Sequence, residues 1–89
     1  MDVSPSLISF VGRSKKRRGI LTMLSQKPLS QREIRSATSM YKSHVSRSLK
    51  ELIEKKLVVC QNPKDRAFKF YKITSLGAKV IQEVNKLLG

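Results

Sequence analysis

The sequence predicts an α+β domain that is mainly helical, with a three-helix core, a two-stranded hairpin and a C-terminal helix. Apolar residues recur at helical spacing in several stretches, a Ser-x-x-Glu pair marks one helix start, and two β-rich runs flank an Asn-Pro turn. The chain has 89 residues and no repeat or evident linker. We therefore expect one domain, 13–89, after an N-terminal arm, 1–12, that is at most partly ordered.

The first two helices are predicted from different signals. A helix over 15–25 follows from Ile20, Leu21 and Leu24, which share one side at helical spacing. The second helix begins after Ser30, because this residue and Glu33 have the spacing of a capping box. It is expected to end near residue 38.

The third helix is predicted over about 41–56, and its two sides differ in polarity. The apolar side carries Val45, Leu49, Leu52 and Ile53. The opposite side carries Ser43, Arg47, Lys50 and Glu54, with His44 and Ser46 on its shoulders. A short helix, a turn and a longer helix are typical of a helix-turn-helix, whose second helix fits the major groove of DNA. We expect base-edge contacts from Ser43, His44, Ser46 and Arg47.

The hairpin is predicted from LVVCQ and AFKFYKIT, which are joined by NPKDR. On the second strand Tyr71 and Ile73 face one way, whereas Phe68 and Phe70 face the other. Only one face can meet the helices. The two phenylalanines therefore need a covering arm, a subunit contact or a bulge, and the sequence does not choose among these.

The last helix, 75–88, is expected to begin after Thr74, a suitable N-cap residue. Its apolar stripe is formed by Leu76, Val80, Val84 and Leu87, and is widened by Ile81 and Leu88. Such a stripe usually completes the domain's own core. Because the core is small, the stripe is also a candidate dimerisation surface, with Val80, Ile81, Val84, Leu87 and Leu88 in the contact.

Charge indicates the class of partner. The chain has 19 Lys and Arg against 6 Asp and Glu, a formal net charge of +13. So basic a chain favours a polyanion, because neutralising phosphates releases counterions. The candidate phosphate ligands are Arg13, Lys15, Lys16, Arg17, Arg18, Ser30, Gln31, Lys42 and Lys50. The alternative for each is an ordinary solvated surface residue.

Other classes have little support in the sequence. No apolar run is long enough to span a membrane and no signal peptide is evident, so we expect a cytoplasmic, nucleoid-associated protein. Cys60 and His44 are each the only residue of their type, and the six acidic residues are dispersed. We therefore expect no metal, no cofactor and no enzymatic activity.

Three segments carry a resemblance to a known family, over roughly residues 15–82. They are KKRRGILTMLSQKPLSQREI, HVSRSLKELIEKKLV and DRAFKFYKITSLGAKV. They are similar to the winged helix-turn-helix regulators, in the style of MarR-like and archaeal ArsR-like proteins. The MarR-type wing pattern D-x-R-x-x-x-V-x-L-T is matched at Asp65, Tyr71, Ile73 and Thr74, and the sequence departs from it at Ala67.

The resemblance implies a winged helix-turn-helix fold and a dimeric, DNA-binding regulator, most simply a repressor. It implies that a wing, 61–67, lies near the minor groove or the DNA backbone through Lys64 and Arg66. Where the family places a serine cap on its recognition helix this chain has Tyr41, and Ser39 is the alternative cap. The partners expected are double-stranded DNA and a second copy of the chain. No feature indicates an effector.

Two other functions remain open at this level. A sequence-independent architectural protein would also use the charge of +13. A protein-interaction module would use the two exposed phenylalanines and would not depend on Arg47.

Overall fold

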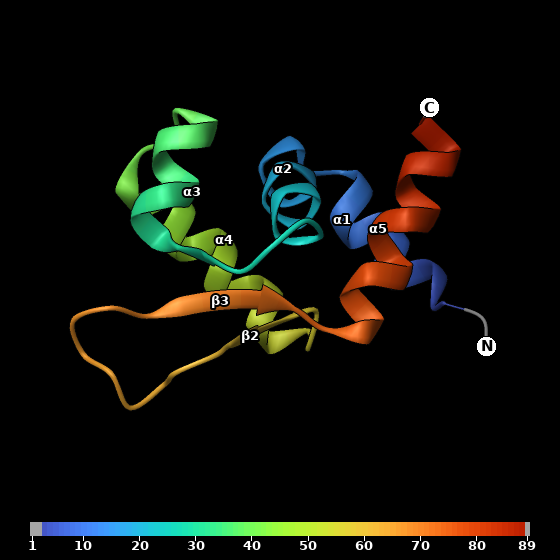
Figure 1. Cartoon of the computed structure of the whole chain (residues 1–89). Helices are drawn as coiled ribbons and strands as arrows, with labels where there is room; N and C mark the ends of the chain where they lie inside the picture. Colours follow the sequence, from blue (N-terminus) through green and yellow to red (C-terminus); the bar gives the residue numbers. More distant parts are fainter. Residues whose placement is uncertain (1–2, 89) are drawn as a thin grey trace.

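The computed structural model describes residues 3–88. Met1 and Asp2 of the predicted arm, and Gly89 of the predicted domain, lie outside this range. The elements are α1 (Pro5–Gly12), α2 (Lys15–Leu24), β1 (Leu29–Ser30), α3 (Gln31–Thr38), α4 (Lys42–Glu54), β2 (Val58–Cys60), β3 (Phe70–Ile73) and α5 (Ser75–Leu88). The predicted fold class is confirmed: three core helices, α2 to α4, precede a two-stranded hairpin and a last helix (Figure 1).

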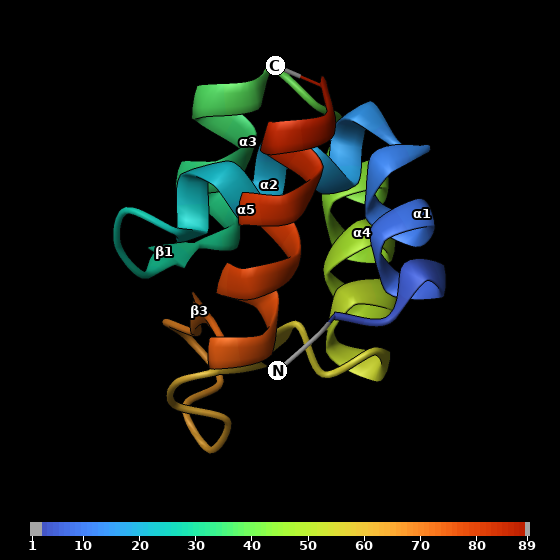
Figure 2. The ribbon, with the colours of Figure 1, turned by 90° about the vertical axis from the view of Figure 1, so that its right-hand side faces the viewer.

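The N-terminal segment differs from the prediction, because residues 5–12 form a helix and not an arm. Pro5 stands at the first turn, where its missing N–H costs no hydrogen bond. Val11 is fully buried, and Leu7 and Ile8 pack against the core. Figures 1 and 2 both show α1 beside α5, at the opposite end of the chain. The helix escaped detection because eight residues are too short for a clear periodic signal.

One hydrophobic core joins all the helices. Its fully buried side chains include Ile20 and Leu21 from α2, Ile34 from α3 and Val45 from α4. The turn between α3 and α4 follows Ser39, whose φ of 59° is left-handed and ends α3. The packing fixes how α4 is presented, because Val45, Leu49 and Leu52 of its inner side all belong to this core.

The helix boundaries come from local hydrogen bonds. The predicted capping box is confirmed: Ser30 Oγ accepts from Glu33 N at 3.2 Å, and Glu33 Oε1 accepts from Ser30 N at 2.9 Å. α4 begins after Tyr41 with no side-chain cap, so Ser39 does not take that role. α4 also ends at Glu54, earlier than predicted, and Lys56 outside it has a φ of 64°.

The sheet is antiparallel with strand order β1-β3-β2. Tyr71 lies opposite both Leu29 and Cys60, so it faces the core side together with Ile73. Phe70 faces outward on β3, whereas Phe68 precedes the strand in the loop. Phe68 is 70% exposed and Phe70 is 37% exposed. Within the described residues no arm covers them and the β2–β3 register is unbroken, so only the predicted subunit contact remains as a prediction.

The C-terminal helix is anchored at its start and buried along one side. Thr74 Oγ1 accepts from Gly77 N at 2.9 Å and donates to the Lys56 carbonyl at 2.8 Å, which confirms the expected cap. Along α5, Val80, Ile81 and Val84 are at most 4% exposed.

The predicted dimerisation surface is therefore wrong for Val80, Ile81 and Val84, because these side chains fill the core of their own chain. Leu87 and Leu88, at the end of α5, are 72% and 57% exposed. None of the helices within residues 3–88 has both the length and the apolar character needed to cross a membrane.

Candidate nucleic-acid interface

The outer side of α4 is an exposed polar surface. Ser43, Ser46, Arg47 and Lys50 are all exposed and lie opposite the buried Val45, Leu49 and Leu52. Lys42, in the first turn, is exposed as well. His44 is half-buried, and its ring meets that of Tyr41 edge-on with centroids 5.7 Å apart. The predicted base-contacting residues are thus brought to one face, with His44 at its edge.

Two hollows border this face. The first, which we call the α3–wing groove, has a volume of about 420 Å³ and lies between α3, the start of α4 and the β2–β3 loop. Its lining residues are Ser30, Gln31, Arg32, Arg35, Lys42, Arg66, Ala67, Phe68, Lys69 and Tyr71. The second, of about 280 Å³, lies between α4 and β3 and includes Ser46 and Lys50. Both hollows are lined by Gln31 and Tyr71, so they adjoin.

The β2–β3 loop, residues 61–69, is the wing, and two of its side chains fix its shape. Asp65 Oδ1 accepts from the backbone N–H groups of Ala67 and Phe68, both at 2.9 Å. Asn62 Oδ1 accepts from Phe70 N at 2.7 Å, and Asn62 Nδ2 donates to the Phe68 carbonyl. Lys64 and Arg66 are exposed. Lys64, Arg66 and Lys69 outnumber Asp65, the one acidic residue of the wing, so the wing carries a net positive charge.

The basic run 13–18 does not act as a unit. Arg17 is turned into the domain: its Nη1 donates to the Phe10 carbonyl at 2.8 Å, and its Nη2 lies 3.2 Å from Glu51 Oε1. The guanidinium also lies over the Phe10 ring, 3.9 Å from the centroid. Arg17 is therefore a structural link between α1, α2 and α4, and the phosphate role predicted for it is not supported.

The other cations of this run are separated by the helical turn of α2. Lys15 and Lys16 line a hollow with Thr38 and Met40, beside the turn that leads into α4. Arg13, in contrast, lines a hollow against the end of α5. Of this run, Lys15 and Lys16 therefore lie beside the turn between α3 and α4.

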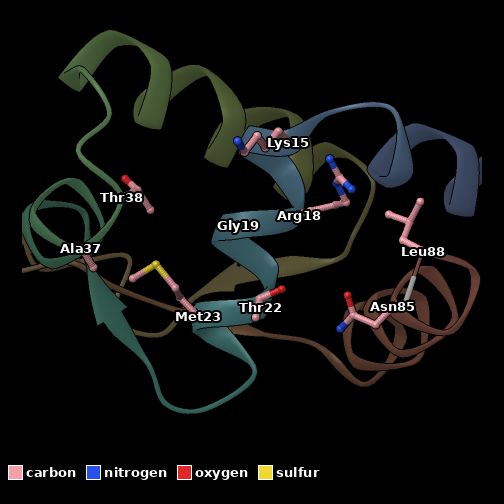
Figure 3. A pocket seen from close by; sticks show the side chains of 9 residues that line it. All are labelled: Lys15, Arg18, Gly19, Thr22, Met23, Ala37, Thr38, Asn85 and Leu88. Carbon is pink, nitrogen blue, oxygen red and sulfur yellow. The ribbon is translucent and has the colours of Figure 1, made fainter.

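Arg18 borders a hollow of about 780 Å³ between α2, the end of α3 and the end of α5. Figure 3 shows its lining, in which Arg18 lies towards Asn85 and Leu88 while Ala37 and Thr38 lie on the opposite side. The Arg18 Nε is shielded from solvent without a hydrogen-bond partner. Neither this hollow nor the one lined by Arg13 includes a residue of the α3–α4 turn or of α4, so Arg18 and Arg13 are not placed with the α4 face.

Two side chains near the interface have altered pKa values. The backbone N–H of Ser30, which donates to the Glu33 carboxylate, is the main cause of that group's pKa being below its ordinary value. Burial raises the pKa of Tyr71, and Cys60 adds to the effect. Tyr71 therefore keeps its hydroxyl proton at neutral pH. No group of three or more His, Cys, Asp or Glu within residues 3–88 is placed to hold a metal ion.

Sequence reasoning missed three cations of the α3–wing groove: Arg32, Arg35 and Lys69. The sequence could have indicated Arg32 and Arg35, because these residues are three apart on α3 and therefore lie on the same side of the helix. For Lys69 the alternation with Tyr71 placed it on the inner face, but nothing indicated that α3 would lie across from it.

A comparison with protein-family models decides the family. The model described as the HVO_A0261 N-terminal domain matches residues 5–89. The chain belongs to this family. The match includes α1, which places the helix inside the family's domain and not before it.

Individual relatives can be compared with this member of the HVO_A0261 N-terminal domain family. The chain is 33% identical over 78 residues to the HTH-type transcriptional regulator TcaR of Staphylococcus aureus, in a match that covers 84% of the chain and 52% of TcaR. It is 28% identical to the transcriptional regulator BldR of Sulfolobus solfataricus, with a TM-score of 0.77 over 84% of the chain and 55% of BldR.

A second structure, of a mutant of MepR from S. aureus bound to an oligodeoxyribonucleotide, is 24% identical with a TM-score of 0.74, over 84% of the chain and 57% of that protein. The predicted resemblance is thus confirmed: the fold is the winged helix-turn-helix of MarR-type regulators. The chain spans about half the length of the relatives it matches.

Proposed function

We propose that the chain is a DNA-binding domain of a sequence-specific transcription regulator, most simply a repressor, acting on the nucleoid in the cytoplasm and without enzymatic activity. The observation that carries the proposal is the exposed polar side of α4, held outward by a fully packed inner side, in a chain of net charge +13. The names of TcaR and BldR as transcriptional regulators support it, as does the DNA bound to MepR.

In this proposal α4 lies in the major groove and its exposed residues divide by role. Ser43, Ser46 and Arg47 contact base edges, with Arg47 suited to a bidentate contact with guanine. Lys42 and Lys50 contact phosphates. His44 contributes at the edge of the face, where its packing against Tyr41 limits its freedom.

Other cations flank α4. Lys15 and Lys16, beside the α3–α4 turn, contact the backbone, and Ser30 and Gln31 add contacts at the start of α3. The wing approaches the adjacent minor groove or backbone through Lys64 and Arg66.

We also propose a two-fold dimer, in which the exposed Leu87 and Leu88 at the end of α5 take part. Two α4 helices would then contact half-sites roughly 10 bp apart. A light-scattering mass equal to one chain at micromolar concentration would contradict the dimer while leaving the DNA-binding proposal in place.

The deciding experiment selects bound duplexes from a random DNA library and then compares the winner with a scrambled duplex. An enriched sequence is expected, and replacing Arg47 by alanine should cost about 1–3 kcal/mol on that sequence and less on the scrambled one. Lys16→Ala is the matched control, because it should weaken both duplexes alike. Equal effects of both variants on both duplexes would remove Arg47 from base recognition.

The net charge of +13 favours one further candidate, a sequence-independent architectural DNA-binding protein. Tight binding with no enriched sequence in the same selection would identify this function. The absence of any DNA binding would refute both.

A further inference from the structure

The α3–wing groove contains cations that the contact between α4 and the major groove does not use. We propose that this groove binds one backbone phosphate of the DNA, with Arg32 and Lys69 as its direct ligands, and that Phe68 packs on the adjoining deoxyribose. The proposal rests on the proposed function and adds to it a phosphate contact by residues that the proposed function does not use.

The charge of the groove is uncompensated. Five of its lining residues are cationic and none is acidic: Arg32, Arg35, Lys42, Arg66 and Lys69 supply the charge. The ion pairs among the described residues join Arg17 to Glu51 and Lys86 to Glu83, so they do not involve the groove. Concave cationic surfaces of this kind concentrate positive potential and attract phosphate.

The acidic residues next in sequence to the lining residues accept hydrogen bonds from backbone N–H groups. Glu33 accepts from the Ser30 N–H, and Asp65 accepts from the Ala67 and Phe68 N–H groups. Each carboxylate therefore shapes a wall of the groove by fixing its backbone. Neither carboxylate forms an ion pair with a cation of the groove, so these cations remain available for an external anion.

Arg35 supplies an independent indication. Its Nε is shielded from solvent and has no hydrogen-bond partner. Unpartnered shielded donors are uncommon in folded proteins, because each forgoes a hydrogen bond that water would have provided. Rotation of the Arg35 side chain towards a bound phosphate would give this donor an acceptor.

Phe68 gives the groove an apolar rim. Its ring is 70% exposed, although its backbone is held by Asp65 on the N–H side and by Asn62 on the carbonyl side. The ring is thus presented to solvent by an already ordered loop, so binding requires little further ordering. A DNA strand alternates phosphates with sugars that have apolar C–H faces. A cationic hollow beside a fixed aromatic ring matches that alternation.

The test compares two double variants that each lower the net charge by two. Arg32→Ala with Lys69→Ala removes the proposed ligands. Lys72→Ala with Lys79→Ala removes cations from the outer face of β3 and from α5, where both side chains are exposed. Arg35 is left unchanged because its shielded Nε makes a folding defect harder to exclude.

The measurement is the affinity of each purified chain for one duplex between about 50 and 200 mM salt. Losing one phosphate contact makes the slope of log affinity against log salt less negative by about 0.9. The ratio of the unaltered chain's affinity to that of the groove variant should therefore fall about 3.5-fold between the lower and the higher salt concentration. The control pair should change the slope by less than half as much. Equal slopes for the two double variants would overturn the phosphate site while leaving the proposed function intact, whereas failure of the unaltered chain to bind DNA would overturn both.

Phe68 is tested by its own pair of variants. Phe68→Ala should lower affinity about tenfold at either salt concentration, because the lost contact is apolar and releases no counterion. Phe68→Leu should recover most of the loss. Phe70→Ala, on the outward face of β3, is the matched control and should bind like the unaltered chain. A loss for Phe70→Ala equal to that for Phe68→Ala would overturn the assignment of Phe68.

Discussion

Replacing Arg17 by alanine should destabilise the domain by about 2–3 kcal/mol, although the sequence places Arg17 among the candidate phosphate ligands. The largest contribution to this loss of stability comes from the hydrogen bond that Arg17 Nη1 donates to the Phe10 carbonyl at 2.8 Å. Hydrogen bonds from charged donors contribute about 1.5–3 kcal/mol. The contact with the Phe10 ring adds about 0.5–1 kcal/mol. The Glu51 pair adds at most about 1 kcal/mol, because the two side chains are 18% and 37% exposed. These contributions share one side chain and do not fully add.

The assay is urea unfolding followed by circular dichroism, together with the salt dependence of DNA affinity. A loss of this size corresponds to a fall in melting temperature of about 10–20 °C for a domain of this length. The neighbouring Lys16→Ala is the control: it should leave stability nearly unchanged and reduce the salt slope by about one phosphate. If Arg17→Ala instead keeps full stability and reduces the salt slope as Lys16→Ala does, the assignment of Arg17 to the interior is wrong.

Three further predictions concern stability. Gly77→Ala should lower the free energy of unfolding in urea by about 1–3 kcal/mol, because the added Cβ would collide with the Leu57 carbonyl oxygen. Gly19→Ala is the control: its Cβ would meet open space, so the variant should gain up to about 1 kcal/mol as alanine favours a helix. Equal stabilities of the two variants would contradict this. Ser30→Ala should cost about 1 kcal/mol by removing the cap of α3, and unchanged unfolding would show that the cap is dispensable. Because the folded-state pKa of Glu33 is lowered, its contribution is present above the ordinary value of 4.5 and lost as the pH falls through the folded pKa. The melting temperatures of the unaltered chain and Glu33→Gln should therefore converge in acid, and a constant gap would refute the carboxylate's role.

The sequence predicted best those features that depend on near neighbours in the chain. The capping box of Ser30 and Glu33 needs only residues three apart, and it formed as expected. The two sides of α4 follow from helical periodicity, so the exposure of Arg47 and the burial of Val45 were both predictable.

Features that depend on which elements meet were less predictable. Arg17 and Lys16 are adjacent in the sequence, yet only Arg17 lies within reach of Phe10 and Glu51. The apolar stripe of α5 shows the same division: Val84 is buried in the core, whereas Leu87 is exposed beyond it. Periodicity reports that a side is apolar, but not which surface covers it.

The packing of α1 against α5 has a consequence for how the chain folds. The two helices lie at opposite ends of the described sequence, so their contact closes the longest loop in the domain. During synthesis α1 leaves the ribosome well before α5, its main partner, has been made. The helix-turn-helix can therefore assemble from local contacts before the ends of the chain come together. Amide hydrogens of α1 should accordingly exchange by local opening, faster than those of α4.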